Sequence, residues 1–495
     1  MKNKKREPLM DTTAEQLSAQ VEQAQHAFEA ARASLPAERE AWLVAIADRL
    51  ESSSEELVPL AAAETHLGDP RLRGELLRTA FQLRLLGAEI RAGEPLDVTI
   101  DHTDPNWGMG PRPDIRRVNE PLGVVAVFGA SNFPFAFSVI GGDSASALAA
   151  GCSVVHKVHS GHEQLAKRTA DVVVEALRSA GAPGGIFSLV TGEESGTMLV
   201  DHPLVQAVAF TGSTRGGRAL FDRAAARPHP IPFYGELGST NPVFVTRLAW
   251  ERRRDNILRE FVGSVAMGIG QFCTKPGFIV VPKSQRKEMD QVLQDAASLM
   301  PRSEMLTTQL RRSYGDSLVE LRDRPDVEVI TGGGGGNEPR MTLLRTSAET
   351  ICRSPEILEH EMFGPASVLV EYSDDSELAR VANLLDGQLT TTIQGEVGED
   401  VDDLRRVLSS KSGRVLWNGW PTGVSVTYAQ QHGGPYPATT ASGTTSVGTS
   451  AIRRFMRPVS YQGFPDGQLP EVLRDENPWM VERRIDGKRS AGRGT

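Results

Sequence analysis

The stretch GQFCTKPG, residues 270–277, contains Cys273, one of only three cysteines in the 495-residue chain. Most free cysteines are small buried apolar residues, but a thiolate is also a strong nucleophile and a metal ligand. Upstream, YGELGST places Glu236 between two glycines, where a carboxylate can approach other backbone closely and move. Alone, Cys273 reads as a packing residue and Glu236 as a solvated loop residue. The thiol of Cys273 nevertheless makes it a candidate nucleophile or metal ligand.

Polar residues follow three apolar runs of strand length. Asn132 lies just after residues 124–128, and Lys157 ends the next run. Ser213, in FTGSTRGG, follows a third run and leads into a helix, so that backbone amides near Gly212 and the Ser213 hydroxyl would form an anion site. The Asn132 amide could donate to a ligand oxygen, although an Asn in a turn is usually only a turn residue. Lys157 suits a phosphate or a ribose hydroxyl.

Two other patterns are weaker. His156, His159 and His162 surround Lys157 at three-residue spacing. No cysteine or carboxylate joins them and a strand-to-loop path would separate them, so we expect no metal. The run TGGGGG, residues 331–336, lacks the Lys-Ser/Thr of a phosphate loop and predicts a surface turn.

The elements around these residues alternate between strands and helices. This alternation, with strands apolar on both faces, predicts an α/β fold with a parallel sheet covered by helices on both sides. Ligands of such sheets bind beyond the carboxyl ends of the strands. Thr12 and Glu15 predict a capping box at the first helix, and the amphipathic helices over 41–52 and 72–90 suggest no chemistry. The remaining expected elements are strands at 124–128, 153–157, 186–190, 207–210 and 278–281, helices at 138–150, 164–180 and 257–268, and edge strands at 114–118 and 479–486.

The overall composition limits the class of protein. The chain has 54 basic and 63 acidic residues, a net charge of −9, which argues against a nucleic-acid or anionic-membrane partner. No apolar stretch reaches the length of a membrane-spanning helix, and the basic start of the chain has no apolar segment behind it, so we expect no membrane span and no secretory signal. Three widely spaced cysteines suit a reducing environment, which predicts a cytoplasmic protein.

The order of the motifs carries more information than any one of them. Asn132, Lys157, FTGS, ELG, Cys273 and EMFGP (361–365) follow one another in an order and at intervals that resemble the aldehyde dehydrogenase superfamily, over roughly residues 121–458. GASNFPFAFSVIGGD, PFYGELGSTNPVF, GQFCTKPG, HGGPYPATT and TTSVGTSAIRRFMRPV are similar to its 2-oxoglutarate semialdehyde (2,5-dioxovalerate) dehydrogenase branch. NADP-dependent fatty-aldehyde dehydrogenases are similar relatives.

The resemblance implies roles for the catalytic residues. Cys273 would attack the aldehyde carbon and form a thiohemiacetal, and the Asn132 amide and the Cys273 backbone N–H would hold the oxyanion. Loss of hydride to the cofactor would then give a thioester, which water activated by Glu236 would hydrolyse. A thiolate suits this role because it attacks well and leaves well from the thioester.

The resemblance also implies the cofactor contacts. Lys157, Gly212 and Ser213 would contact the adenosine ribose and the pyrophosphate, Glu361 would hold the nicotinamide ribose, and Phe363 would pack beside the ring. Many NAD-using relatives carry a glutamate three residues after the lysine, where this chain has Ser160. A carboxylate there would repel a 2′-phosphate, so Ser160 favours NADP, with NAD also accepted.

The implied architecture is a Rossmann-like cofactor domain, an α/β catalytic domain and a small β-arm for oligomerisation, in a homodimer or homotetramer. The expected division is a tail at 1–9, a cofactor-binding domain at 10–110 and 119–231, a catalytic domain at 232–435, and oligomerisation strands at 111–118 and 470–490.

Several alternatives stay open at this stage. The preferred substrate is 2-oxoglutarate semialdehyde, and Phe137 and Thr422 are weak candidates for substrate contacts. A fatty or other aliphatic aldehyde is the first alternative. A cofactor-independent cysteine hydrolase or esterase using Cys273 and Glu236 is the second, although the sequence offers no clear Cys–His pairing. A binding protein that has lost activity is the third.

Overall fold

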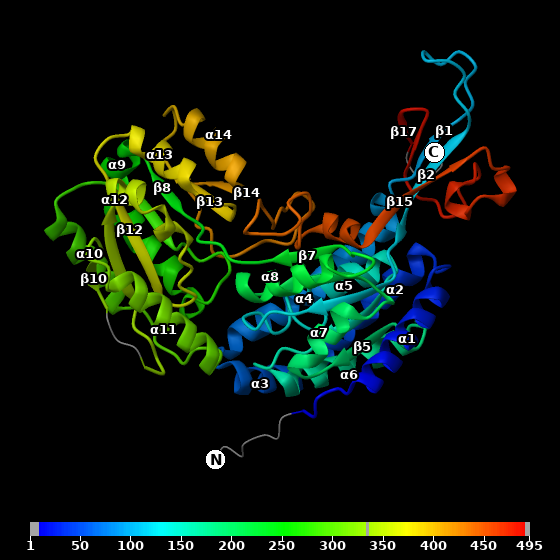
Figure 1. Ribbon diagram of the computed structural model, residues 1–495, viewed down its shortest axis with the longest axis horizontal. Helices are drawn as coiled ribbons and strands as arrows, with labels where there is room; N and C mark the ends of the chain where they lie inside the picture. Colours follow the sequence, from blue (N-terminus) through cyan, green and yellow to red (C-terminus); the bar gives the residue numbers. More distant parts are fainter. Residues whose placement is uncertain (1–8, 333–335, 491–495) are drawn as a thin grey trace.

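The computed structural model describes residues 9–332 and 336–490. The expected tail, except for residue 9, and the centre of the predicted glycine turn, Gly333–Gly335, lie outside these residues. Figure 1 shows two lobes side by side and an arm that projects from one of them. None of the helices in the described ranges has the length and apolar character needed to cross a membrane.

The first lobe is built on a five-stranded sheet in which all neighbouring strands are parallel. Its order is β5-β4-β3-β6-β7, so the chain builds one side of β3 first and then the other. This arrangement creates a topological switch point between β3 and β6, where ligands of such sheets bind. The strands are β3 (Val124–Phe128), β4 (Ser153–Lys157), β5 (Phe187–Val190), β6 (Val205–Thr211) and β7 (Phe233–Glu236).

Helices cover both faces of this sheet (Figure 1). All five residues of β3 are buried, as the apolar run predicted. The α/β prediction is therefore confirmed. The N-terminal helices are α1 (Ala14–Ala31), α2 (Pro36–Ser52), α3 (Ser54–Thr65) and α4 (Asp69–Ala92), and the helices that connect the strands are α5 (Gly142–Ala150), α6 (Glu163–Ser179), α7 (Glu193–Asp201) and α8 (Thr214–Ala225).

The second lobe contains a seven-stranded sheet of order β10-β11-β12-β9-β8-β13-β14. Only β10 and β11 pair antiparallel, and separate apolar cores fill its two faces. Its strands are β8 (Val243–Val245), β9 (Phe278–Pro282), β10 (Glu328–Thr331), β11 (Thr342–Ser347), β12 (Ala366–Tyr372), β13 (Gln388–Gln394) and β14 (Ser412–Trp417). Its helices are α9 (Arg247–Ala266), α10 (Arg286–Ser298), α11 (Thr308–Arg322), α12 (Ala348–Arg353), α13 (Ser376–Leu384) and α14 (Asp402–Lys411).

The arm is a third sheet, ordered β15-β2-β1-β16-β17. The strand predicted at 114–118 is present as β2, but the one predicted at 479–486 shrinks to β16, because Met480 has a left-handed backbone in a turn that precedes it. Neither is an edge strand as predicted, because β2 pairs with β15 and β1, and β16 pairs with β1 and β17. The arm strands are β1 (Thr99–Asp101), β2 (Ile115–Pro121), β15 (Met456–Gln462), β16 (Arg483–Ile485) and β17 (Lys488–Ser490).

The capping box of α1 lies one residue later than predicted. Thr13 Oγ1 accepts from the Gln16 backbone N–H at 3.2 Å, and Gln16 Oε1 accepts from the Thr13 N–H at 3.0 Å. Thr12 instead ties the start of α1 to the first sheet, since its Oγ1 accepts from the N–H of Thr191 at 2.9 Å. The pattern was right and its register was wrong.

A left-handed turn links α9 to the cysteine stretch. The helix predicted at 257–268 starts ten residues earlier, at Arg247, where Thr246 caps it, and it ends at Ala266. Gly268, Ile269 and Gly270 then have φ values of 59°, 56° and 67°. A Cβ on Gly270 would lie 2.1 Å from the carbonyl oxygen of Gly364, so this glycine allows the turn and the EMFGP loop to touch.

We predict that Gly270→Ala destabilises the protein, because it adds a left-handed backbone penalty of about 1–2 kcal/mol and a clash with backbone. Gly263→Ala is the matched control, since it lies in α9 and a Cβ there meets nothing within 4 Å. Thermal unfolding should show a lower midpoint for the first variant and an equal or higher one for the second. Equal midpoints for Gly270→Ala and the unchanged protein would contradict this prediction.

Candidate active site

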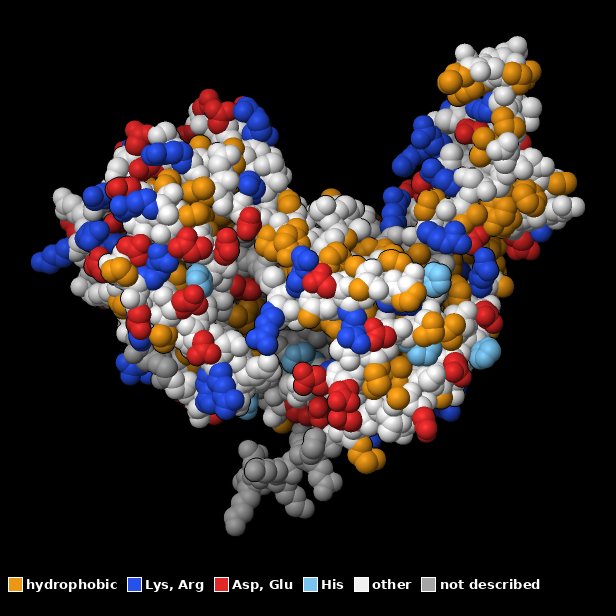
Figure 2. Space-filling view, viewed as in Figure 1, with side chains coloured by type: hydrophobic (Ala, Val, Ile, Leu, Met, Phe, Trp, Pro, Cys, Tyr) orange, Lys and Arg blue, Asp and Glu red, His pale blue; other side chains and the backbone are white. Residues whose placement is uncertain are grey.

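Cys273 lies between the left-handed turn and β9, at the junction of the two lobes, and Figure 2 shows the surface hollowed between these lobes. The side chain is half-buried. The fully buried Asn241 holds its loop, since Asn241 Nδ2 donates to the carbonyl oxygens of Cys273 at 2.8 Å and Lys275 at 3.0 Å. Gln388 Oε1 in turn accepts from the Asn241 N–H at 3.0 Å. Two layers of buried amides therefore position the thiol.

Glu236 ends β7 and reaches the thiol together with a residue that sequence reasoning missed. His432 Nε2 lies 2.8 Å from Glu236 Oε1 and 3.7 Å from Cys273 Sγ. Ser446 donates to the other carboxylate oxygen of Glu236 at 2.8 Å. One ligand-type atom from each of Glu236, Cys273 and His432 lies within 4.8 Å of the other two. The predicted pair is thus brought together, with two added tethers.

The same nitrogen of His432 faces both Glu236 and Cys273, while His432 Nδ1 is buried without a partner. In a nucleophile–His–carboxylate relay the two partners occupy different ring nitrogens. Here Nε2 can serve only one of them at a time. The sequence offered no clear Cys–His pairing, but the long loop before β15 carries His432 Nε2 to within 3.7 Å of Cys273 Sγ. The relay itself is nevertheless not formed.

The charges at this site oppose thiolate formation. Burial, the negative charge of Glu236, its hydrogen bond with the thiol and the charge of Glu361 raise the pKa of Cys273 well above its usual value, with the charge of Arg414 opposing them. Burial also raises the pKa of Glu236, but the charge of His432 and hydrogen bonds from His432, Ser446 and Cys273 outweigh it and lower that pKa. The resting pair is a neutral thiol that donates to a carboxylate.

Asn132 is buried beside the cysteine stretch. Its Nδ2 donates to the Gln271 carbonyl oxygen at 2.9 Å, two residues before Cys273. Arg71 Nη2 donates to the Asn132 backbone carbonyl at 2.7 Å and fixes the turn after β3. A side-chain amide has two N–H donors. One of them is therefore left for a ligand oxygen at the nucleophile.

The residues predicted to bind a cofactor gather at the carboxyl ends of neighbouring strands. Lys157 ends β4, and Ser213 is the N-cap of α8, where its Oγ accepts from the Gly216 N–H at 3.2 Å. Gly212 and Ser160 are exposed in the loops after β6 and β4. The ends of these strands flank β3 on both sides, so these residues share the edge that contains the switch point.

Glu361 faces this edge from the second lobe. A Cβ on Gly238 would lie 3.0 Å from Glu361 Oε2, so the carboxylate packs against the glycine-flanked loop after β7. Burial raises the pKa of Glu361 to about 7, against the charge of Lys275 and a hydrogen bond from the Ser239 backbone. Lys275 Nζ donates to the carbonyl oxygens of Met362 and Ala366, both at 2.7 Å. Phe363, two residues after Glu361, is half-buried.

The two weak substrate candidates lie on another side of the thiol. The Phe137 ring centroid is 6.3 Å from that of His432. Thr422 Oγ1 lies 2.7 Å from Ser264 Oγ, and the next residue, Gly423, donates its N–H to Thr274 Oγ1 at 3.2 Å. Both segments therefore contact direct neighbours of Cys273.

The three histidines near Lys157 do not converge on one point. His159 and His162 stack with centroids 5.6 Å apart, and His162 Nε2 lies 2.8 Å from Ser138 Oγ. His156 is fully buried on β4, and burial with the nearby positive charge of Lys157 lowers the pKa of His156 to about 3 and of His159 to about 4. They are neutral interior residues of the first lobe.

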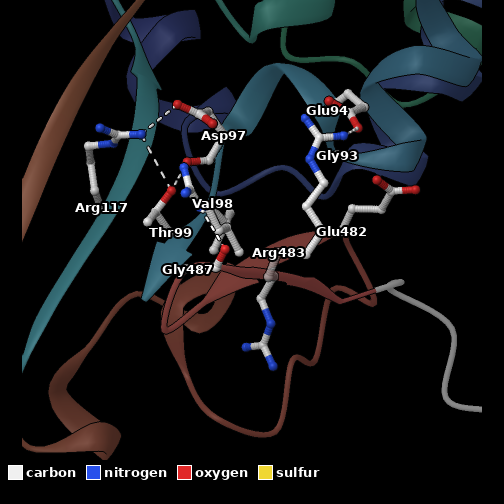
Figure 3. Close-up of a pocket in the computed structure, with 11 residues that line it drawn as sticks. Gly93, Glu94, Asp97, Val98, Thr99, Arg117, Glu482, Arg483 and Gly487 are labelled. Carbon is white, nitrogen blue, oxygen red and sulfur yellow. Dashed lines mark hydrogen bonds and ion pairs between the residues drawn. The ribbon is translucent and has the colours of Figure 1, made fainter. Parts of the chain in front are cut away.

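A second hollow lies at the root of the arm, with a volume of about 340 Å³. Figure 3 shows Arg117, Asp97 and Glu482 among the side chains around it, and Arg117 Nη2 pairs with Asp97 Oδ2 at 2.7 Å. Its lining has four arginines and three acidic residues but neither a cysteine nor a histidine. It offers charge pairing without a nucleophile, so the candidate active site is the one at Cys273.

The chain is similar in sequence to known proteins of one family. Residues 3–457 match the aldehyde dehydrogenase family. The chain is 44% identical over 479 residues to alpha-ketoglutaric semialdehyde dehydrogenase 2 of Azospirillum brasilense. This alignment covers 94% of this chain and 90% of that protein. It is 41% identical over 457 residues to the alpha-ketoglutaric semialdehyde dehydrogenase of Acinetobacter baylyi, with 91% and 87% covered.

Solved structures share the fold at lower identity. A glyceraldehyde-3-phosphate dehydrogenase of Methanocaldococcus jannaschii in complex with NADP aligns with a TM-score of 0.77 at 19% identity, covering 93% of this chain and 96% of that one. A variant of aldehyde dehydrogenase C from Pseudomonas syringae in complex with NAD⁺ and octanal aligns with a TM-score of 0.76 at 21% identity, covering 92% and 90%. These alignments confirm the predicted fold class.

We predict that Glu236→Gln makes Cys273 more reactive toward iodoacetamide near pH 8, although it removes the base. Loss of the adjacent negative charge lowers the thiol pKa, and each unit of decrease raises the thiolate fraction about tenfold below the pKa. The measurement is the alkylation rate of each cysteine peptide from pH 6 to pH 10.

The other cysteines provide internal controls. Cys352 is exposed and should react equally in both proteins, whereas Cys152 is fully buried and should not react. An unchanged pH profile for Cys273 in Glu236→Gln would contradict the assigned electrostatics.

Proposed function

This chain belongs to the aldehyde dehydrogenase family, and we propose that it oxidises 2-oxoglutarate semialdehyde to 2-oxoglutarate with NADP as hydride acceptor. The family resemblance expected from the motifs is confirmed, and the protein is an oxidoreductase that acts on aldehydes. The relatives named for this semialdehyde cover most of the chain. The observation that carries the proposal is a half-buried thiol placed within 4.8 Å of an ionised, tethered carboxylate.

The first step is proton transfer from the thiol. The proton leaves to solvent, because the raised pKa of Cys273 and the lowered pKa of Glu236 make the carboxylate too weak a base to keep it, and Glu236 stays ionised for the later hydrolysis. Sulfur then bonds to the aldehyde carbon, and the carbonyl oxygen becomes an oxyanion. The free N–H of the Asn132 amide and the Cys273 backbone N–H are the donors for this oxygen. Loss of one such donor typically lowers kcat by about 10²–10³.

The residues at the carboxyl edge of the first sheet fit a dinucleotide. The amides at the start of α8 around Gly212 and Ser213 suit a pyrophosphate, and Lys157 suits the adenosine ribose or its phosphate. Glu361 is a half-buried acceptor whose charge is only partly compensated by Lys275, so it can accept hydrogen bonds from ribose hydroxyls. Phe363 would pack beside the nicotinamide. When bound, NADP accepts the hydride released as the thiohemiacetal becomes a thioester.

Hydrolysis of the thioester needs a base, and Glu236 is the base in reach. Both of its oxygens are occupied at rest, Oε1 by His432 and Oε2 by Ser446. Glu236 must therefore exchange one tether for a water molecule before it can accept a proton from that water. Release of the thiolate from the tetrahedral adduct then gives the carboxylate product.

The geometry disfavours the cysteine hydrolase alternative. Such an enzyme needs an imidazole that takes the thiol proton while a carboxylate holds its other nitrogen. His432 has its second nitrogen buried without a partner, and Nε2 already contacts Glu236. A hydrolase would also leave Lys157, Ser213 and Glu361 without a role.

Assembly and location are further parts of the proposal. The arm projects away from the lobes and its sheet ends in the edge strands β15 and β17, which suit contact with a second copy. We propose a homo-oligomer, a dimer or tetramer, in which 111–118 and 470–490 mediate assembly. In this proposal 10–110 with 119–231 form the cofactor domain and 232–435 the catalytic domain. Three unpaired cysteines suit the cytoplasm.

We predict that variants of Glu236 and Cys273 separate hydride transfer from thioester hydrolysis. Glu236→Gln should release one equivalent of NADPH per site in a burst at 340 nm and then turn over slowly, because hydride transfer precedes hydrolysis. Cys273→Ala should give neither burst nor turnover. No reduction of NADP or NAD by the folded protein with any aldehyde would contradict the proposal, as would a burst in Cys273→Ala.

We also predict that Ser160→Glu reverses the cofactor preference. A carboxylate at this exposed loop position would repel a 2′-phosphate, which should lower kcat/KM for NADP by about 10² and affect NAD much less. Ser160→Thr keeps the hydroxyl and is the control. Steady-state kinetics with both cofactors make the test, and an unchanged NADP-to-NAD ratio in Ser160→Glu would contradict the assignment.

A further inference from the structure

Arg78, on α4, carries a charge that no carboxylate of the described residues pairs with. Its Nη1 is buried without a hydrogen-bond partner, and Nη2 makes one long contact, 3.4 Å, to the carbonyl oxygen of Val424. Its guanidinium lies 5.2 Å from the Phe137 ring centroid. A buried N–H without an acceptor is unfavourable unless a ligand or water satisfies it. The sequence suggested no chemistry for the helix at 72–90. In the structure this helix, α4, presents Arg78 Nη1 as a donor that is free to bind a ligand.

Arg414, in β14, is a second cation with neutral partners only. Its Nη1 donates to the Gly423 carbonyl at 2.9 Å and its Nη2 to the Pro421 carbonyl at 2.7 Å. Its Nε and Nη2 also contact Thr390 Oγ1, at 3.2 and 3.1 Å. Carbonyl and hydroxyl oxygens orient a guanidinium but leave its charge without a counter-ion.

Both arginines converge on one loop beside the nucleophile. Arg414 binds Pro421 and Gly423, Arg78 binds Val424, and the Gly423 N–H reaches Thr274, the residue after Cys273. On the other side of Arg78, Phe137 links it to His432, which touches Cys273 Sγ. The thiolate of Cys273 acts electrostatically on both cations and raises their pKa values against the larger lowering by burial.

The nearest acidic group does not neutralise Arg78. Glu75, one turn earlier on α4, acts on Arg78 only through space, and its Oε1 accepts from the backbone N–H groups of Phe135 and Ala136 at 2.8 and 3.0 Å. This oxygen is committed to the turn after Asn132, and Oε2 is buried without a hydrogen bond to Arg78 or to any other group of the described residues. The positive charge of the arginine pair therefore points to an external anion.

We propose that Arg78 and Arg414 form the subsite for the carboxylate of the substrate, with the open Nη1 of Arg78 as its main donor. This inference rests on the proposed function and adds the residues that select an acidic aldehyde. A guanidinium binds a carboxylate through strong charge-assisted hydrogen bonds. An alkyl chain in the same place would bury two charges without compensation, which disfavours the fatty-aldehyde alternative.

The kinetic test compares Arg78→Met with Arg84→Met. Arg84 lies on the same helix but is half-buried and paired with Asp48 and Glu51, so it controls for loss of an arginine from α4. We expect Arg78→Met to lower kcat/KM for 2-oxoglutarate semialdehyde by about 10² and to affect pentanal much less, and Arg84→Met to change neither appreciably. Arg78→Lys, which keeps the charge but not the planar fork, should fall between. Equal losses for both aldehydes in Arg78→Met would overturn the subsite.

A second readout does not depend on turnover. Iodoacetate carries a carboxylate and iodoacetamide does not, so the ratio of their alkylation rates at Cys273 reports anion binding near the thiol. We expect Arg78→Met to lower this ratio about tenfold or more and Arg84→Met to leave it unchanged. An unchanged ratio in Arg78→Met would overturn the subsite even if the enzyme oxidises aldehydes. A lowered ratio in a protein that oxidises no aldehyde would support the subsite and overturn the proposed function.

Discussion

The site depends on a buried carboxylate held beside a half-buried thiol. Two negative charges cannot both form cheaply in this environment, so the proton shared by Cys273 and Glu236 controls when the nucleophile appears. Ionised Glu236 is kept in place by His432 and Ser446, and the thiol stays neutral. A resting thiol is protected from oxidation and alkylation, because the thiolate is the reactive form. The positive nicotinamide ring of a bound cofactor would shift this balance toward thiolate, which would couple nucleophile formation to the presence of the hydride acceptor.

The two-lobed fold supplies this contact from distant parts of the chain. The first sheet provides Asn132 after β3 and Glu236 at the end of β7, and the second sheet provides Cys273 before β9. A loop between β14 and β15 closes the junction, since Thr439 forms a bridge with Glu236 and the Leu237 N–H donates to the Ala438 carbonyl. That loop brings His432 to the thiol. Each lobe alone would hold only half of the site.

The sequence predicted the fold and the site correctly where a functional residue lies next to a clear strand or helix pattern. Buried strands, the helices between them and the polar residues at strand ends could be read directly, and the order of motifs led to the family. His432 was not assigned a role, because nothing local in HGGPYPATT shows that its loop folds back onto β7. Arg78 was missed for a similar reason, since it sits in an amphipathic helix packed on the first-lobe core and nothing local shows that its side chain reaches the loop at Val424. Two predictions were wrong in their exact residues. The capping box is shifted because Thr12 bonds to Thr191, and the strand at 479–486 is shortened because Met480 has a left-handed backbone.

The central claim is that Cys273 carries the acyl group and Glu236 releases it. Mass spectrometry of Glu236→Gln, quenched after mixing with NADP and 2-oxoglutarate semialdehyde, tests it most directly. The account predicts one acyl adduct per chain, on the peptide that contains Cys273, which hydroxylamine removes as expected for a thioester. An acyl group on another residue, or NADP reduction with no adduct on Cys273, would contradict it.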